Sequence, residues 1–157
     1  MSDTYEFAPQ LAEGLTWEDQ PKGFRFSTAS RTVTETDLVT FVGLAGFIGS
    51  MFLDGRRARE LGYRGRLVPG FLTLILAEGL VLQTNVLHGT GMGFLGCDLS
   101  VAEPVYVGDT IRVDVEVTES RATSKPGRGI VTSTNTVVND AGKVVLTYQP
   151  VRMQKGR

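Results

Sequence analysis

The sequence is poor in residues that cross-link chains or bind metals, with one cysteine, Cys97, and one histidine, His88, among 157 residues. A single cysteine excludes a disulfide within the chain and a cysteine-rich metal site, and it is typical of the reducing cytoplasm. No spacing of His, Cys, Asp and Glu indicates a metal. His88 has no acid or nucleophile near it in sequence, so we expect it to pack in a surface loop.

An excess of charge is also missing. The 16 basic and 17 acidic residues, with a pI near 5.8, give no overall attraction to nucleic acid or anionic membranes. The first ten residues, MSDTYEFAPQ, have neither the basic nor the apolar region of a signal peptide. The longest apolar run, 67–82, is short for a membrane span and contains Pro69 and Glu78. We expect a cytoplasmic protein without nucleic-acid or membrane partners.

The length favours one domain around one core. We expect an N-terminal lead-in over residues 1–23 and a single domain over 24–157. Residues 24–33 partly alternate and predict a strand. Thr34 and Asp37 form a capping-box-like start, which predicts a helix over 35–45.

The second half of the chain reads as strands. Residues 109–118, DTIRVDVEVT, alternate strictly between apolar and polar side chains, as a half-buried antiparallel strand does. Further strands are predicted at 91–102, 129–138 and 143–153, with a hairpin turn at 139–142.

Between these halves lies the run LVPGFLTLILAEGLVL, residues 67–82. A helix that is apolar all round has no solvent face, so we expect it to be wholly buried and to continue to about Val86. Its one ionisable side chain, Glu78, must then be paired, protonated or part of a site. The order of elements predicts an α+β fold in which an antiparallel sheet curls around this helix.

The pattern resembles the hotdog fold and, within it, the MaoC-like family of (R)-specific enoyl-CoA hydratases and dehydratases. The segments that carry the resemblance are 31–46, 62–80, 103–117 and 124–148. The resemblance implies a homodimer or higher even oligomer whose sheets join edge to edge. It also implies an acyl thioester of coenzyme A or acyl carrier protein, bound at the subunit boundary, with no cofactor beyond the coenzyme A of the substrate.

The catalytic signature of that family is altered here. Its hydratases carry an Asp and a His in a G-D-x-N-P-x-H pattern, and the two side chains activate water and return a proton to the α-carbon. The matching segment is GFIGSMF, residues 46–52, with Phe47 in place of the Asp and Phe52 in place of the His. The usual hydratase activity is therefore in doubt.

Two other residues of the long helix are candidates for catalysis. By resemblance, the backbone amide of Gly70 donates to the thioester carbonyl, as a free helix N-terminus can do for an oxyanion; alternatively, Gly70 only allows close packing. Glu78 lies nine residues after Pro69, a spacing that resembles the catalytic carboxylate of small hotdog thioesterases. The alternative for Glu78 is a structural pair with an arginine or a hydroxyl, or a bond across a dimer interface.

Candidate substrate-binding residues flank these positions. The apolar side chains that replace the polar signature either line the acyl site or fill the core; they are Phe47, Ile48, Met51 and Phe52. Arg64 and Arg66 belong to an arginine-rich stretch suited to the phosphates of coenzyme A. Three hypotheses follow: an acyl-thioester protein of the hydratase/dehydratase family, a thioesterase that uses Glu78, or a non-catalytic binder or partner subunit of an active homologue.

Overall fold

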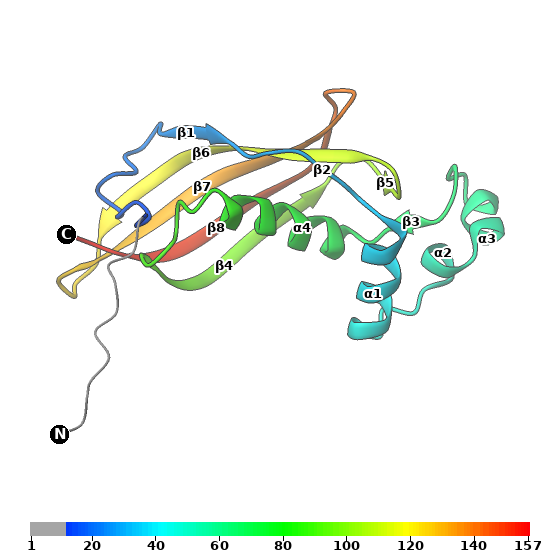
Figure 1. The fold of residues 1–157 in the computed structure, drawn as a ribbon, viewed down its shortest axis with the longest axis horizontal. Helices are drawn as coiled ribbons and strands as arrows, with labels where there is room; N and C mark the ends of the chain where they lie inside the picture. Colours follow the sequence, from blue (N-terminus) through cyan, green and yellow to red (C-terminus); the bar gives the residue numbers. More distant parts are fainter. Residues whose placement is uncertain (1–11) are drawn as a thin grey trace, which may run out of the picture.

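The computed structural model describes residues 12–157, so residues 1–11 of the expected lead-in lie outside the described part. Its largest element is an antiparallel sheet with the strand order β1-β6-β7-β8-β4, in which β2 also pairs with β6 (Figure 1). The long strands are β4 (Gly91–Val101), β6 (Thr110–Ala122), β7 (Arg128–Asn139) and β8 (Val144–Lys155). The short strands β1 (Arg25–Ser27) and β2 (Arg31–Thr32) follow the outer edge of β6.

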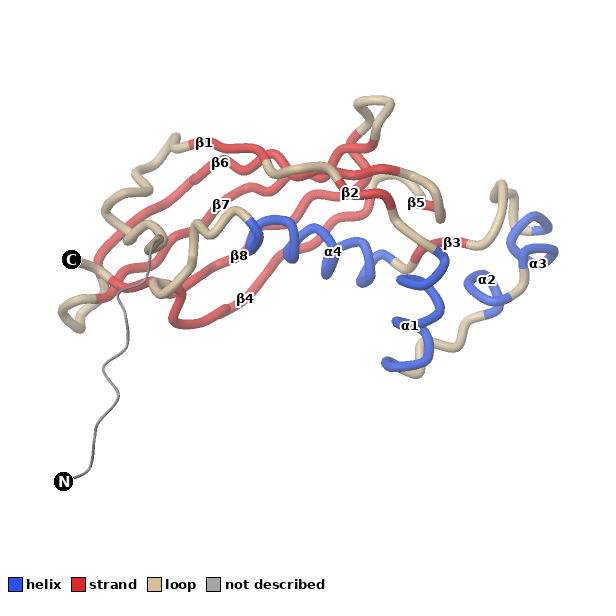
Figure 2. The backbone as a smooth tube through the Cα atoms, in the orientation of Figure 1, coloured by secondary structure: helices blue, strands red, loops and turns tan. Residues whose placement is uncertain are grey.

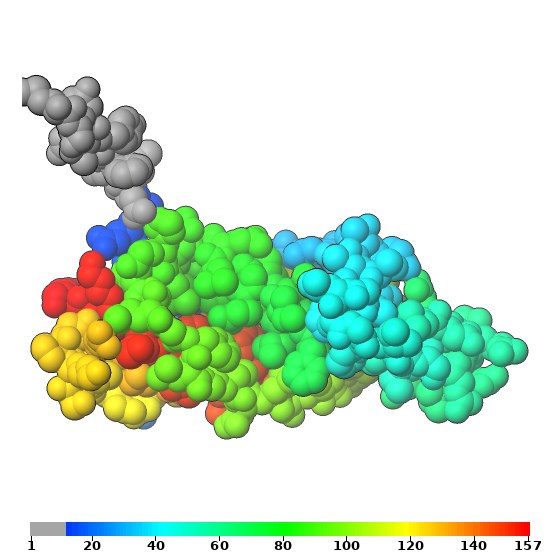
Figure 3. Space-filling view, turned by 90° about the horizontal axis from the view of Figure 1, so that it is seen from below, coloured from blue at the N-terminus to red at the C-terminus, as the bar shows by residue number. Residues whose placement is uncertain are grey.

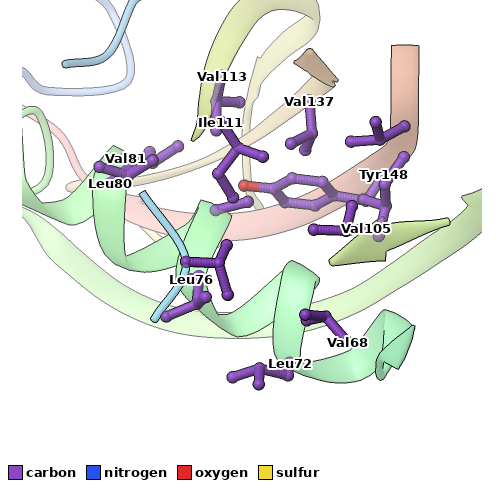
Figure 4. Close-up of a cluster of buried hydrophobic side chains, with 14 of the residues drawn as sticks. Val68, Leu72, Leu76, Leu80, Val81, Val105, Ile111, Val113, Val137 and Tyr148 are labelled. Atoms are coloured by element: carbon purple, nitrogen blue, oxygen red, sulfur yellow. The ribbon is translucent and has the colours of Figure 1, made fainter. Parts of the chain in front are cut away.

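The long helix α4 (Gly70–Gln83) lies along one face of this sheet (Figure 2). Its inward side chains, among them Leu72, Leu76 and Leu80, meet the inward residues of β6, β7 and β8 in one core (Figure 4). The alternation along β6 explains its part in the core, because Ile111, Val113, Val115 and Val117 are all buried. The expected α+β architecture is confirmed.

Helix α1 (Glu35–Ala45) has the predicted bounds. The Thr34 hydroxyl accepts a hydrogen bond from the Asp37 amide, and the Asp37 carboxylate accepts one from the Thr34 amide, so the capping box is present. Helices α2 (Ser50–Leu53) and α3 (Gly55–Glu60) follow, and all three lie beyond the N-terminal end of α4 (Figure 1). Asp54 caps α3 by accepting from the amides of Arg56 and Arg57.

The strand expected over 24–33 is instead divided into β1 and β2. The break falls at Thr28, whose hydroxyl accepts a hydrogen bond from the Val113 amide at 3.0 Å. A side-chain oxygen thus takes the place of a backbone carbonyl in the pairing with β6, and the regular ladder resumes only at Arg31. The alternation of apolar and polar side chains does not predict that a side-chain hydroxyl replaces a backbone carbonyl at one position.

The prediction of a wholly buried helix over 67–82 is wrong in two respects. Leu67–Val68 form the short strand β3, which pairs with β5 (Val105–Tyr106), and the helix begins only at Gly70. Phe71 and Ile75 are each 56% exposed and Leu82 is 52% exposed. The physical reason is that the sheet covers α4 from one side only, so the opposite stripe of apolar side chains is left open.

This open stripe lies on a face where α4, α1 and the edge strand β4 are all visible (Figure 3). Strand β4 pairs with β8 on one side, and no strand of residues 12–157 pairs with its other edge. It adds further exposed apolar side chains, Met92, Phe94 and Leu95. A face of this kind is typical of a surface that another molecule covers.

The described part of the lead-in packs against the sheet. The Trp17 amide donates to the Lys155 carbonyl, and the Trp17 ring lies so close to Gly129 that a Cβ there would come within 2.1 Å of it. Gln20 donates to the buried Gln154 side chain. Among residues 12–157, no helix combines the length and the apolar character that crossing a bilayer requires.

Candidate functional site

An apolar cavity of about 360 Å³ opens beside the first turn of α4. Helices α2 and α4 and the short strands β3 and β5 contribute residues to it, as do the end of β4 and the start of β8. Of the candidate residues, it contains Met51, Phe52 and Gly70. The other residues that line it are Tyr63, Leu67, Val68, Thr73, Val101, Ala102, Glu103, Pro104, Val105, Val145 and Leu146.

Gly70 places backbone amides at this cavity. It is the first residue of α4, after Pro69, and no side chain caps this end of the helix. The first-turn N–H groups of a helix have no partner within the helix, and they carry the positive end of its dipole. A Cβ on Gly70 would lie 3.0 Å from Cγ2 of Val101, so the glycine also allows β4 to approach closely. Both suggested roles of Gly70 therefore have a basis in the structure.

Phe47 and Phe52, which the sequence resemblance aligns with the acid and the base of the family signature, contact each other. The ring centroids of Phe47 and Phe52 are 5.4 Å apart, and Phe47 also meets Phe41 at 5.5 Å and Phe71 at 6.2 Å. These distances are typical of favourable aromatic pairs. Phe52 lines the cavity, whereas Phe47 and Ile48 do not, and Ile48 is 78% exposed. Phe47 and its three aromatic neighbours thus form an apolar cluster beside the cavity.

Glu78 is held in a buried ion pair. Arg152 Nη2 lies 2.6 and 2.7 Å from the two carboxylate oxygens, and the Tyr148 hydroxyl donates to Oε2 at 2.8 Å. The Arg152 side chain is 7% exposed and that of Glu78 is 22% exposed. Burial, followed by the charge of Glu78, raises the pKa of Tyr148 well above its usual range, so the phenol stays protonated. Glu78 is not among the residues that line the Gly70 cavity.

Arg64 and Arg66 lie at a separate shallow cleft of about 260 Å³, which also includes Tyr106. The Arg64 guanidinium pairs with Asp109 and stacks 4.1 Å above the centre of the Tyr106 ring. Arg66 pairs with Glu35 at 2.5 Å. Both guanidinium groups therefore already have carboxylate partners, which tie the loop before β3 to the body of the fold.

Sequence reasoning missed the polar groups of the cavity. Tyr63 follows α3, Thr73 lies one turn into α4, and Glu103 stands between β4 and β5. Only Glu103 left a signal in the sequence, as an acidic residue followed by proline at the end of a strand. His88 is exposed in the loop after α4, as expected. Within residues 12–157, no three His, Cys, Asp or Glu side chains converge as a metal site would require.

An antiparallel sheet wrapped on one long helix, with an apolar cavity at the N-terminus of that helix, defines the hotdog class of folds. A protein of Mycobacterium tuberculosis described as a double hotdog fold matches with a TM-score of 0.81 and 23% identity, over 92% of this chain and 45% of that one. The family model of the MaoC like domain matches residues 19–139. The chain therefore belongs to the MaoC-like dehydratase family.

Two proteins of this kind illustrate the similarity. The (R)-specific enoyl-CoA hydratase of Aeromonas caviae is 31% identical over 122 residues, which cover 78% of this chain and 87% of the hydratase. The structure of the MaoC-like dehydratase of Rhodospirillum rubrum matches with a TM-score of 0.82 and 27% identity, over 92% of this chain and 99% of that one. The resemblance read from the sequence is confirmed at the level of the family.

Proposed function

We propose that this protein binds an acyl thioester in the Gly70 cavity. The observation that carries the proposal is an apolar cavity of about 360 Å³ at an uncapped helix N-terminus. The acyl chain would lie among Leu67, Val105 and Leu146, and the thioester carbonyl would accept a hydrogen bond from the Gly70 amide. Similarity to an enoyl-CoA hydratase supports a thioester of coenzyme A or of acyl carrier protein as the ligand class.

The usual hydration step lacks its residues in this proposal. Phe47 and Phe52 have no group that takes up or donates a proton, and their rings pack against each other. The chain is thus a family member whose standard acid–base pair is replaced. It acts on its ligand, if at all, through other groups.

Arg64 and Arg66 remain our candidates for the coenzyme A phosphates. Arg64 is 64% exposed and Arg66 is 31% exposed at their side chains, so a phosphate can reach both. A coenzyme A phosphate would compete with Asp109 for Arg64 and with Glu35 for Arg66. The contribution of these two arginines to binding should therefore fall as ionic strength rises.

The thioesterase alternative depends on Glu78. Two hydrogen bonds from Arg152 and one from Tyr148 occupy its carboxylate oxygens, which supports the structural role for Glu78. Assay of free thiol release from a panel of acyl-CoAs tests the alternative. Release that collapses in Glu78→Gln, in a variant shown to be folded, would support it; no release from any substrate would end it.

We also propose that a second copy of the chain covers the open stripe of α4 and the free edge of β4. Both surfaces are apolar and lie on the same face (Figure 3), and an edge strand can extend its sheet by pairing with its own copy. If the chain is instead a partner subunit of an active homologue, that homologue would cover the same face. Co-purification of a homologue with this chain would distinguish such a mixed assembly from a homodimer.

Calorimetric titration of the purified protein with crotonyl-CoA, octanoyl-CoA and free coenzyme A tests the binding proposal. We expect octanoyl-CoA to bind more tightly than free coenzyme A, because only the former fills the cavity. Val101→Trp should weaken octanoyl-CoA binding at least about tenfold by blocking the cavity beside Gly70, whereas Val144→Trp, at an exposed valine outside the cavity, should not. Equal affinity for coenzyme A with and without the acyl chain would contradict the proposal.

A further inference from the structure

The Gly70 cavity contains one carboxylate, that of Glu103. No other Asp, Glu, His, Lys or Arg is among the described residues that line it, and Tyr63 adds its only phenol. The two residues come from different segments: Tyr63 lies in the loop before β3, and Glu103 lies in the connection from β4 to β5. An acid–base group therefore lies in a cavity from which the usual Asp and His are missing.

Backbone geometry brings Glu103 close to the N-terminus of α4. Val101 lies against Gly70, with its Cγ2 atom 3.0 Å from the position of a Cβ there. Glu103 is two residues further on, so its Cα is within about 7 Å of that of Val101. Glu103 and Gly70 line the same cavity, which is where a thioester carbonyl on the Gly70 amide would lie.

The connection that carries Glu103 has a fixed, irregular conformation. The amides of Ala102 and Glu103 both donate to the Val145 carbonyl, with N···O distances of 2.9 and 3.2 Å. Two successive residues that share one partner on the neighbouring strand form a bulge-like irregularity. Such irregularities re-aim side chains and are common beside active sites.

Glu103 also differs from Glu78 in being free. Glu103 and Tyr63 are both exposed, and within residues 12–157 neither the Glu103 carboxylate nor the Tyr63 hydroxyl makes an ion pair or a side-chain hydrogen bond. Glu78 is the opposite case, since Arg152 and Tyr148 occupy it. A carboxylate that must exchange protons with a ligand needs free oxygens, and Glu103 has them.

We propose that Glu103 is the catalytic acid–base of this cavity and that it hydrates 2-enoyl thioesters; the inference rests on the proposed binding site. Glu103 takes a proton from water while the water oxygen bonds to C3 of the acyl group. The electrons of the C2=C3 bond move into the thioester carbonyl, and the Gly70 amide stabilises the enolate oxygen. The protonated Glu103 then returns the proton to C2, so one water is added across the double bond and the carboxylate is restored. Tyr63 positions the water.

Two assays on the same purified variants test this inference: calorimetric binding of octanoyl-CoA and the loss of the conjugated double bond of crotonyl- and octenoyl-CoA. Glu103→Gln should lower hydration at least about 100-fold while affinity changes less than about twofold. Glu103→Asp should keep part of the rate, and Tyr63→Phe should lower it less than Glu103→Gln does. Glu119→Gln, a matched change at an exposed glutamate outside the cavity, should leave it unchanged.

The outcomes separate the two proposals. If octanoyl-CoA binds but the wild-type protein hydrates neither enoyl-CoA, or Glu103→Gln retains the rate, the role of Glu103 is refuted and the binding site stands. If no acyl-CoA binds, the binding site itself is refuted.

Discussion

Arg152 and Glu78 join strand β8 to helix α4 through two short contacts, 2.6 and 2.7 Å from Nη2 to the two carboxylate oxygens. The pair lies between the sheet and its central helix, and Arg152 is buried there together with other polar side chains of the sheet, among them Asn135 and Gln154. Tyr148, also on β8, donates a third hydrogen bond to the same carboxylate. The one charge in the apolar helix is thus neutralised by the strand on which it packs.

Removing the charge of only one partner of this pair should lower the free energy of unfolding. Glu78→Gln keeps the shape of the side chain but leaves the buried Arg152 guanidinium without its counter-charge, which costs roughly 2–4 kcal/mol of unfolding free energy. Urea unfolding at fixed protein concentration measures the loss. The double variant Glu78→Met/Arg152→Met removes both charges, and we expect it to be more stable than Glu78→Gln. A Glu78→Gln protein as stable as the wild type would show that the pair contributes nothing.

The start of α1 should give a pH-dependent contribution to stability. Burial alone would raise the pKa of Asp37, but hydrogen bonds from Thr34 and the charge of Arg31 outweigh it and lower the pKa. A lowered folded-state pKa means that the stabilisation is complete above the unfolded value of about 3.9 and is lost as the pH falls through the folded value. Asp37→Asn should therefore be less stable than the wild type by about 1 kcal/mol at pH 7. The difference should shrink in unfolding experiments at successively lower pH; a constant difference would exclude the electrostatic origin.

Gly70→Ala tests whether the missing side chain at Gly70 matters for ligand binding, because alanine keeps the backbone amide. Gly70→Ala adds a methyl group that Val101, an exposed valine at the end of β4, can accommodate by a small shift. We expect the thermal midpoint to change little and octanoyl-CoA affinity to fall several-fold, because the methyl and the displaced Val101 narrow the cavity. Gly43→Ala in α1, where a Cβ meets nothing, is the matched helical control and should leave affinity unchanged. Loss of stability without loss of affinity would show that the missing side chain serves packing against Val101 and does not keep the cavity open.

The sequence predicted most of the fold because most of its signals are local. The capping residues Thr34 and Asp37 located α1 to the residue, and the alternation after Asp109 located β6. The errors arose where a tertiary contact overrides the pattern. The Thr28 hydroxyl interrupts the first strand, and the exposure of Phe71 depends on how far the sheet reaches around α4, which no local pattern encodes.

The site could be predicted only in part for the same reason. Gly70, Met51 and Phe52 were candidates by resemblance to the family, and all three line the cavity. Glu103 and Tyr63 reach it through the β3–β5 pairing, a contact between segments about 40 residues apart that neither segment predicts alone. The partner of Glu78, Arg152, likewise comes from the last strand and has no sequence signal that links it to the helix.

The open stripe of α4 should determine the oligomeric state. Ile75 lies at its centre and is 56% exposed, so Ile75→Lys should place a charge in the proposed contact with a second copy and shift the protein to monomers. Sedimentation velocity over a range of concentrations measures this shift. Val144→Lys, a change of the same kind at an exposed valine of β8, is the control and should sediment as the wild type does. A wild-type protein that is monomeric at all concentrations would contradict the proposed pairing.

The replaced acid–base pair suggests a gain-of-function experiment. Phe47→Asp/Phe52→His introduces the Asp and His that the sequence resemblance assigns to these positions. Each single change supplies only one of the two groups, which are expected to act together. We expect hydration of crotonyl-CoA by the double variant to exceed that of either single variant at least tenfold. The loss of aromatic contacts of Phe47 with Phe41 and Phe71 should cost about 1–3 kcal/mol of stability, so the assay belongs well below the thermal midpoint. Adding Glu103→Gln to the double variant identifies the group responsible: a rate that persists comes from the restored pair, and a rate that disappears shows that Glu103 still carries the reaction.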